Sequence, residues 1–192
     1  MTELDLLAEE VGVHGRTLRR AAAQGLLRSA RRGAREVVIP PSERRYVQTH
    51  WPLVGALLEQ LRKQPNARLA VLYGSAAHGS DQPDSDLDIL VSLRRDDYRA
   101  RSELAGALQE ASRRRVQLVS VDQAEDAPML LADVLRDGRV LVDRDDDWER
   151  LERQGRSIAR RAQAEDDRQQ RLAWSAPDAL DEIARGLTVG PR

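Results

Sequence analysis

The chain has 192 residues, a formal net charge of −1 and 41% hydrophobic residues, a composition typical of a globular protein with room for two small domains. It contains no cysteine, which excludes disulfides, thiol catalysis and zinc-finger sites. No apolar stretch approaches the roughly 20 residues needed to span a membrane, and the polar start from Met1 to Asp5 is unlike a signal peptide. These features predict a cytoplasmic protein with no membrane contact.

The first 25 residues predict two short helices joined by a tight turn. Apolar residues at helical spacing extend from Leu4 to Val11, Gly12 ends the pattern, and a second helix is predicted from Thr17 to Gln24. This arrangement resembles the helix-turn-helix heads of many bacterial DNA-binding regulators, although His14 stands near the usual position of a serine-like cap. A helix-turn-helix used only for protein contact is the alternative. The side chains expected to contact DNA from this region are Arg16, Thr17, Arg19 and Arg20.

A β-hairpin wing is predicted after these helices. Strand-like segments at residues 26–29 and 35–39 flank a predicted turn at residues 30–34. Two further DNA contacts are expected at the tip of this wing, Arg31 and Arg32.

Positive charge is concentrated in this part of the chain. Nine arginines and two glutamates lie between Arg16 and Arg45, a net charge of +7 in a chain whose total is −1. Because phosphate neutralisation supplies most non-specific affinity for nucleic acid, this cluster predicts a DNA-binding surface. A single helix-turn-helix contacts only a few base pairs, so the expected binder is a homodimer on an inverted repeat in its own promoter.

The segment from Leu72 to Val91 is the most informative part of the sequence. An apolar strand predicted at residues 68–73 stops at Gly74, and the small residues that follow can form a helical turn whose free N–H groups face a phosphate. Asp86 and Asp88 then open a second apolar strand, and strand alternation places both carboxylates on one face. Hard carboxylate oxygens opposite a phosphate-binding turn are suited to Mg²⁺ and a nucleoside triphosphate.

The order of Gly-Ser, a spacer from Ala76 to Ser85 and Asp-x-Asp resembles the minimal nucleotidyltransferases of the DNA polymerase β superfamily. The resemblance extends from about Trp51 to Val142 and implies chemistry with Mg²⁺ and ATP or another NTP. It implies metal-binding and catalytic roles for Asp86 and Asp88. The nucleotide contacts expected from the motif and its spacer are Gly74, Ser75, His78 and Ser85, with a surface role as the alternative for the histidine.

One departure from the family pattern concerns the third carboxylate. Members of the family usually carry it on the next central strand, where it helps to bind a second metal and draws the proton from the attacking hydroxyl. That strand is predicted at residues 115–121, and the matching position holds Gln117. A neutral amide cannot act as a base and is a weak metal ligand. Asp122 is nearby, but alternation places it on the opposite face.

The expected fold class is α+β, with a winged helix-turn-helix, a small polymerase β-like α/β domain and a C-terminal helix. The expected boundaries are 1–50 for the DNA-binding head, 51–65 for a helical connector, 66–144 for the nucleotidyltransferase domain and 145–192 for a charged helix and tail. Within the junction, Ser42 is the expected helix N-cap, and Pro52 is expected to start a second helical segment after a kink that is either rigid or flexible.

The C-terminal part predicts helices and one further strand. Helices are expected at residues 96–111 and 128–136, and a strand at 138–143. The acidic run at residues 143–147 precedes another helix, where negative charge favours the helix N-terminus over the alternative of a metal site. A sparse apolar stripe on that last helix fits dimerisation, docking of a second protein, or an exposed structural helix, and its members are Leu151, Ile158, Ala162 and Leu172.

Two classes of function fit these patterns. The first is a nucleotidyltransferase with a DNA-binding head that transfers NMP, with AMP as the expected group, from NTP·Mg to a hydroxyl of a protein or RNA. Minimal relatives often serve in toxin–antitoxin pairs, so the resemblance implies autoregulation and a cognate toxin or antitoxin protein, or tRNA, as partner. The second class is a repressor or antitoxin whose transferase-like domain acts by binding only. Aminoglycoside-modifying transferases share the motif but have no need of a helix-turn-helix.

Overall fold

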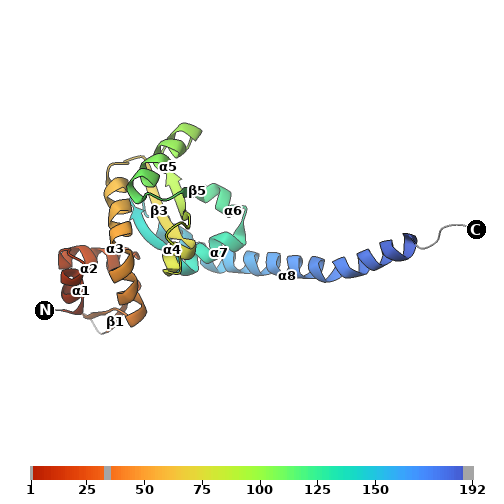
Figure 1. Ribbon diagram of the computed structural model, residues 1–192, viewed down its shortest axis with the longest axis horizontal. Helices are drawn as coiled ribbons and strands as arrows, with labels where there is room; N and C mark the ends of the chain where they lie inside the picture. Colours follow the sequence, from red (N-terminus) through yellow and green to blue (C-terminus); the bar gives the residue numbers. More distant parts are fainter. Residues whose placement is uncertain (1, 33–35, 188–192) are drawn as a thin grey trace, which may run out of the picture.

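The computed structural model describes residues 2–32 and 36–187. A helical head lies beside a four-stranded sheet with helices on both faces, and one long helix projects from this body (Figure 1). This mixture of helices and strands confirms the predicted α+β class. In chain order the elements are α1 (Glu3–Glu10), α2 (Gly15–Ala23), β1 (Ala30–Arg32), β2 (Glu36–Val38), α3 (Pro41–Arg62), β3 (Ala67–Tyr73), α4 (Gly74–His78), β4 (Leu87–Leu93), α5 (Tyr98–Ser112), β5 (Val116–Ser120), α6 (Val121–Glu125), α7 (Pro128–Asp137), β6 (Arg139–Asp143) and α8 (Asp147–Leu187).

The head contains the two helices and the antiparallel hairpin that the sequence indicates. His14 caps α2, because its Nδ1 accepts a hydrogen bond from the N–H of Arg16 at 3.1 Å. The predicted position of the first hairpin strand was wrong. Because β1 and β2 pair from Ala30 with Val38 to Arg32 with Glu36, β1 occupies part of the predicted turn. Residues 33–35, which hold the end of the predicted turn and the start of the predicted second strand, lie outside the described residues, and DNA recognition by this head stays a prediction.

A single helix, α3, joins the head to the sheet. The helix begins at Pro41, and Pro40 is its N-cap, so the prediction of Ser42 as the N-cap was wrong. Proline is suited to the first turn of a helix, because backbone N–H groups there have no partner within the helix. The predicted division into two helical segments was also wrong, since α3 continues through Pro52 to Arg62. Proline costs one backbone hydrogen bond there, whereas burial of apolar side chains on both sides of it favours an unbroken helix. The buried apolar side chains of α3 are Tyr46, Val47, Trp51, Val54, Leu57 and Leu61.

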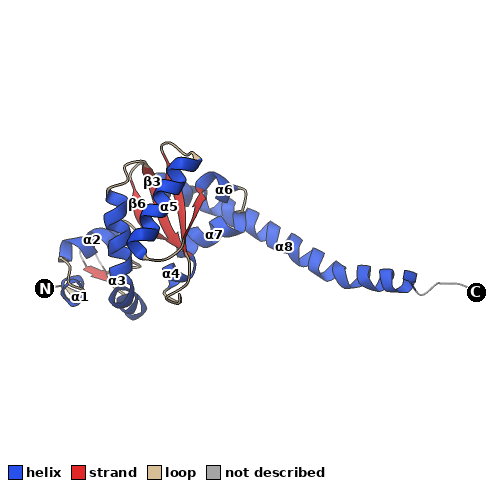
Figure 2. Ribbon diagram, turned by 45° about the horizontal axis from the view of Figure 1, so that its top comes forward, coloured by secondary structure: helices blue, strands red, loops and turns tan. Residues whose placement is uncertain are grey.

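The sheet has the strand order β5-β4-β3-β6. β3 pairs antiparallel with both β4 and β6, while β4 pairs parallel with β5. Successive residues of β3 contribute to two different cores, because strand side chains alternate between the faces. Ala70 and Leu72 pack with the head, α3 and α5, whereas Leu69 and Val71 pack with α6, α7 and α8. Figure 2 shows these helices around the sheet. The first core therefore joins the head to the sheet.

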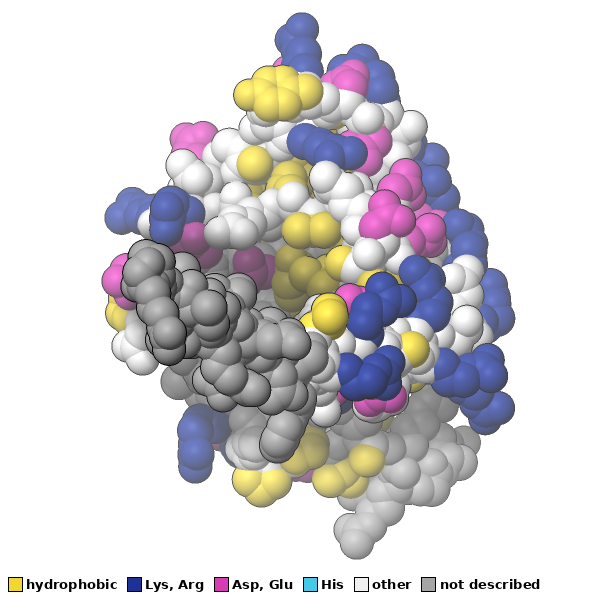
Figure 3. All heavy atoms as spheres, turned by 90° about the vertical axis from the view of Figure 1, so that its right-hand side faces the viewer, with side chains coloured by type: hydrophobic (Ala, Val, Ile, Leu, Met, Phe, Trp, Pro, Cys, Tyr) yellow, Lys and Arg dark blue, Asp and Glu magenta, His cyan; other side chains and the backbone are white. Residues whose placement is uncertain are grey.

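The long helix α8 starts at the acidic run. Asp143 accepts hydrogen bonds from the N–H groups of Asp147 at 3.0 Å and Trp148 at 3.2 Å, so this carboxylate caps the helix. Leu151 and Ile158 are buried in the core beside α7, and the helix then projects away from the body. Seen from the side to which α8 projects, hydrophobic side chains gather near the centre of the face, with charged side chains of both signs around them (Figure 3). Among the described helices, none has the length and apolar character needed to cross a membrane.

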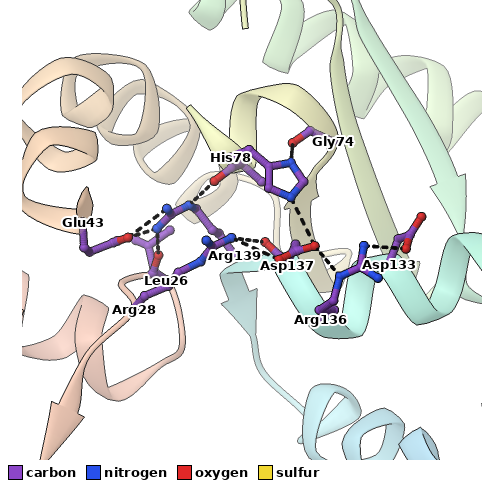
Figure 4. Close-up of polar contacts among 10 residues, drawn as sticks. Leu26, Arg28, Glu43, Gly74, His78, Asp133, Arg136, Asp137 and Arg139 are labelled. Atoms are coloured by element: carbon purple, nitrogen blue, oxygen red, sulfur yellow. Dashed lines mark hydrogen bonds and ion pairs between the residues drawn. The ribbon is translucent and has the colours of Figure 1, made fainter. Parts of the chain in front are cut away.

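A buried ion pair fastens the head to the sheet and to α4. Arg139 on β6 is 1% exposed and Glu43 on α3 is 3% exposed, and the two pair through both guanidinium nitrogens at 2.5 and 3.0 Å. Arg139 also donates to the carbonyl of Leu26 at 3.0 Å and to that of Ala77 at 2.6 Å, as Figure 4 shows in part. One guanidinium thus connects four separate segments of the chain.

Arg139→Met is expected to lower the free energy of unfolding by about 3–5 kcal/mol, because it leaves Glu43 buried without a partner. Chemical denaturation measures this loss. Adding Glu43→Leu to Arg139→Met should regain part of it, since the remaining cost is the two unpaired carbonyls. The control is Arg136→Met, which removes an arginine that is 67% exposed and should cost less than about 1 kcal/mol. Equal losses in the two single variants would show that the buried pair does not hold the head.

Candidate active site

Two carboxylates lie at the start of the central strand β4. Asp86 immediately precedes the strand, and Asp88 is its second residue. Leu87 and Ile89 are fully buried in the core formed with α3 and α5. Strand alternation therefore turns Asp86 and Asp88 together toward the other face, where both are partly exposed.

A glycine turn meets Asp88 from the neighbouring strand. β3 ends at Tyr73, which is opposite Asp88 in the register, and Gly74 follows with a φ of +71°. A Cβ on Gly74 would lie 2.7 Å from Oδ2 of Asp88, so glycine is required both by the backbone and by this contact. No described side chain caps the N-terminus of α4, and the Ser75 hydroxyl makes no hydrogen bond within the described part of the chain. These groups remain available to a phosphate.

Asp88 carries negative charge that no described cation neutralises. Burial raises the pKa of Asp88, and the charge of Asp86 raises it further. Burial, together with the charge of Asp88, also raises the pKa of Tyr73 to about 12. Two carboxylates that repel each other beside a turn with free N–H groups fit Mg²⁺, which takes one or two carboxylates and completes its shell with water and substrate phosphates.

Asp86 is held by two side chains that flank or lie on β5. Nε of Arg115 donates to Oδ1 at 2.8 Å, and Nε2 of Gln117 donates to Oδ2 at 3.0 Å. Gln117 is opposite Asp88 in the parallel register, which places the amide beside the carboxylate pair. Over residues 2–32 and 36–187, no group of three or more His, Cys, Asp or Glu side chains forms a metal site. The site therefore offers two carboxylates and an amide.

The other two predicted nucleotide contacts have protein partners. Nδ1 of His78 donates to the carbonyl of Gly74 at 2.8 Å, and Nε2 is 3.2 Å from Asp137 (Figure 4). The Ser85 hydroxyl accepts a hydrogen bond from the N–H of Gln82 at 2.9 Å and closes the turn before the carboxylates. Both side chains shape the loop around the site, and a contact of either with nucleotide stays a prediction.

The loop between α4 and β4 is held by residues that the sequence analysis did not single out. Asp81 contacts Nε2 of His50 at 2.8 Å and accepts a hydrogen bond from Nη1 of Arg114 at 2.6 Å. Nε of Arg114 also donates to the carbonyl of Ser85 at 2.8 Å. Burial alone would raise the pKa of Asp81, but the hydrogen bonds from Arg114 and His50 lower it. Because these partners are 31 and 33 residues from Asp81, no local spacing indicates them.

The predicted DNA contacts on α2 face two different sides. Arg19 turns toward α1, where Nη1 is 2.5 Å from Oδ1 of Asp5. Thr17 and Arg20 line a hollow of about 320 Å³ between α2, α3 and β6, and Arg16 lines an adjoining one. Asp86 and Asp88 line neither hollow, so both hollows are separate from the candidate active site. The two predicted contacts on the wing lie in β1.

Gly74→Ala is expected to destabilise the fold by more than about 1 kcal/mol and to displace Asp88, because alanine strains a positive φ and its Cβ meets the carboxylate. Thermal melting and metal-dependent nucleotide binding both report this change. Gly55→Ala is the matched control, since nothing lies within 4 Å of a Cβ there and the residue is inside α3. It should be neutral or stabilising by up to about 1 kcal/mol. A Gly74→Ala protein as stable as Gly55→Ala would refute the close contact.

Asp88→Asn is expected to raise the melting temperature at neutral pH in metal-free buffer, because the amide removes a charge that burial and Asp86 disfavour. The pKa of Asp88 in the folded state lies above its ordinary value of 3.8, so its ionisation costs stability only above that range. The gain should therefore disappear as the pH falls below the ordinary value. Melting curves from about pH 3 to about pH 8 test this. Asp86→Asn, which loses the contact with Arg115, should show no such gain, and a lower melting temperature for Asp88→Asn at neutral pH would contradict the account.

Comparison with known proteins identifies the fold around this site. Residues 56–147 match the family described as polymerase beta, nucleotidyltransferase. A crystal structure of a toxin–antitoxin with AMP-PNP is 30% identical, with a TM-score of 0.50 over 62% of this chain and 95% of that chain. A crystal structure of the toxin–antitoxin MntA-HpeT, with aspartates replaced by glutamate at two positions one residue apart, is 29% identical, with a TM-score of 0.51 over 62% and 95%. No curated protein sequence matches the chain. The chain therefore belongs to the polymerase β nucleotidyltransferase family, and its domain is related to those of toxin–antitoxin complexes.

Proposed function

We propose that this protein transfers NMP, with AMP as the expected group, from NTP·Mg to a hydroxyl on a protein or RNA, as a component of a toxin–antitoxin pair. The observation that carries the proposal is the pair Asp86 and Asp88, placed against the Gly74 turn in a chain of the nucleotidyltransferase family. A 30% identical relative that was crystallised with AMP-PNP supports an adenine nucleotide as the substrate.

Different residues of the site bind the phosphates and the metal in this reaction. The N–H groups at the start of α4 and the Ser75 hydroxyl bind phosphate oxygens, while Asp86 and Asp88 would hold magnesium. Bound there, magnesium would supply charge neutralisation at the phosphates. Arg115 is 80% exposed, so its side chain can leave Asp86 and turn to the triphosphate at little cost. The acceptor oxygen attacks the α-phosphorus, the bond to the bridging oxygen breaks, and pyrophosphate leaves.

The acceptor proton is the unusual part of this scheme. Gln117 occupies the position beside Asp88, and its amide donates to Asp86 instead of accepting a proton. The base that removes the acceptor proton must therefore come from the acceptor or from solvent. We expect NMP transfer to be slow, because the domain itself supplies no base at this position.

The relatives support a protein partner, because their structures are of toxin–antitoxin complexes. For this chain we infer a cognate toxin or antitoxin protein, with tRNA as the other acceptor class. The hydrophobic side chains gathered on the face beside α8 support contact with a protein (Figure 3).

We further infer that the head binds DNA in the protein's own promoter, as a homodimer on an inverted repeat. Its two helices, its hairpin and the net charge of +7 between Arg16 and Arg45 support this role. The head is assigned to residues 1–50, the connector to 51–65, the nucleotidyltransferase domain to 66–144 and the C-terminal helix and tail to 145–192. Binding to duplex DNA that weakens steeply with salt tests the assignment.

A second candidate function is favoured by one observation, the amide at Gln117. Without a third carboxylate, the domain can bind nucleotide or a partner while performing no transfer. The protein would then act as a repressor or antitoxin by binding only.

ATP is expected to bind only in the presence of Mg²⁺, and Asp86→Asn combined with Asp88→Asn should abolish this binding while the protein stays folded. Titration calorimetry with and without metal measures it. Asp84→Asn is the matched control, since this exposed aspartate lies in the same loop and should bind ATP as the wild type does. Binding that needs no metal and survives in the double variant would exclude the proposed site.

Gln117→Asp is expected to leave transfer from labelled ATP to the partner equal or faster, because it adds a carboxylate beside Asp88. Gln109→Asp makes the same change at an exposed position of α5 and should have no effect. Loss of a robust wild-type activity in Gln117→Asp would show that the amide itself serves the reaction. Absence of transfer from both proteins, with ATP binding intact, would favour the binding-only function.

A further inference from the structure

We propose that a backbone phosphate of DNA is seated between α2 and α3, where Arg62, outside the head, contacts it together with Arg16 and Arg20. The proposal rests on the proposed DNA-binding head and extends its surface onto the helix that enters the nucleotidyltransferase domain. It assigns a nucleic-acid role to a residue that lies beyond the basic cluster of the sequence.

Two adjoining hollows define the place. The first, of about 320 Å³, lies between α2 and the walls formed by α3 and β6. The second, of about 380 Å³, is lined by His14, Arg16, Thr17, Arg20 and Arg62. Arg20 and Arg62 line both hollows, so guanidinium groups from two different helices converge on one opening.

These arginines make no direct polar contact with a described side chain, in contrast with many others in the chain, although the charge of Arg62 lowers the pKa of Glu59 one turn earlier on α3. Within the described residues, the side chains of Arg16, Arg20 and Arg62 make no ion pair and no hydrogen bond. Asp143, the carboxylate among the residues that line the first hollow, is already used to cap α8. Three guanidinium groups that line one hollow without a carboxylate in direct contact repel each other, and a phosphate with several acceptor oxygens relieves that repulsion.

The position of the hollow favours a phosphate of the DNA strand over a free ion. It borders α2, the proposed reading helix, and contacts to phosphates beside such a helix fix its register on the duplex. The two walls are fixed relative to each other, since Leu18 and Ala21 of α2 are buried in the same core as Trp51 of α3. The site is therefore formed before DNA arrives.

The test is a salt series of DNA binding by the full chain, on its upstream duplex and on an unrelated duplex. Arg62→Gln should weaken binding to both by the same factor, roughly tenfold, and should reduce the slope of log K against log salt by about one per protomer. Lys63→Gln is the matched control, because it removes the neighbouring charge, whose ammonium is 3.0 Å from Glu59 on the outer surface. It should leave both quantities unchanged.

Three results would overturn the proposal, and they are distinguishable. If Arg62→Gln behaves like Lys63→Gln while the wild type binds DNA, the phosphate site is wrong and the DNA-binding head stands. If calorimetry shows that AMP binds the wild type without metal, and that Arg62→Gln loses this binding with an unchanged DNA salt slope, the site serves a free phosphate compound. If the folded wild type binds neither duplex at low salt, the head itself does not bind DNA. Melting curves of Arg62→Gln should match the wild type, because the side chain makes no ion pair or hydrogen bond with the described residues and interacts there only with the charge of the exposed Glu59.

Discussion

The buried pair of Arg139 and Glu43 is the interaction on which the arrangement of this molecule depends. Burial of two charges is costly unless every donor and acceptor is satisfied, and here the guanidinium meets the carboxylate, two backbone carbonyls and the ring of Tyr46 at 3.4 Å. The carbonyls belong to Leu26 in the head and Ala77 in α4. The junction that the sequence allowed to be either rigid or flexible is thus a continuous helix packed in a common core.

The same framework continues to the loop that carries the carboxylates. Tyr46 stacks on His50 with ring centroids 4.6 Å apart, and His50 in turn contacts Asp81. Arg114 links Asp81 to the carbonyl of Ser85, the residue before the Asp-x-Asp motif. A series of direct contacts therefore runs from Leu26, which follows α2, to Ser85 beside the candidate active site, so the head and the site belong to one packed framework.

Elements whose structure is determined by neighbouring residues could be predicted from the local sequence pattern. The alternation after Asp86 predicted β4 from Leu87 to Leu93, and the Gly-Ser turn with its spacer led to the family that the comparison found. The register of β5 also places Gln117 where the sequence argument expected a missing carboxylate.

The errors share a physical origin in tertiary contacts. Pro52 ends a helix by local rules, but burial of Trp51 and Val54 on either side keeps α3 continuous. Arginine is normally exposed, so nothing local distinguishes Arg139 from the other arginines of the chain, and its partner Glu43 is 96 residues away. The strand predicted at residues 115–121 likewise continued one residue beyond the end of β5. Val121 instead starts the short helix α6, because Ser120 forms a capping box with Gln123.

Differential scanning calorimetry of the full chain tests most directly whether the head and the nucleotidyltransferase domain form one unit. A shared core held by Arg139 and Glu43 predicts a single cooperative transition that includes both parts, with a calorimetric enthalpy equal to the van't Hoff enthalpy. Two separable transitions, one of them removed when residues 1–40 are deleted and the other unchanged, would contradict the account.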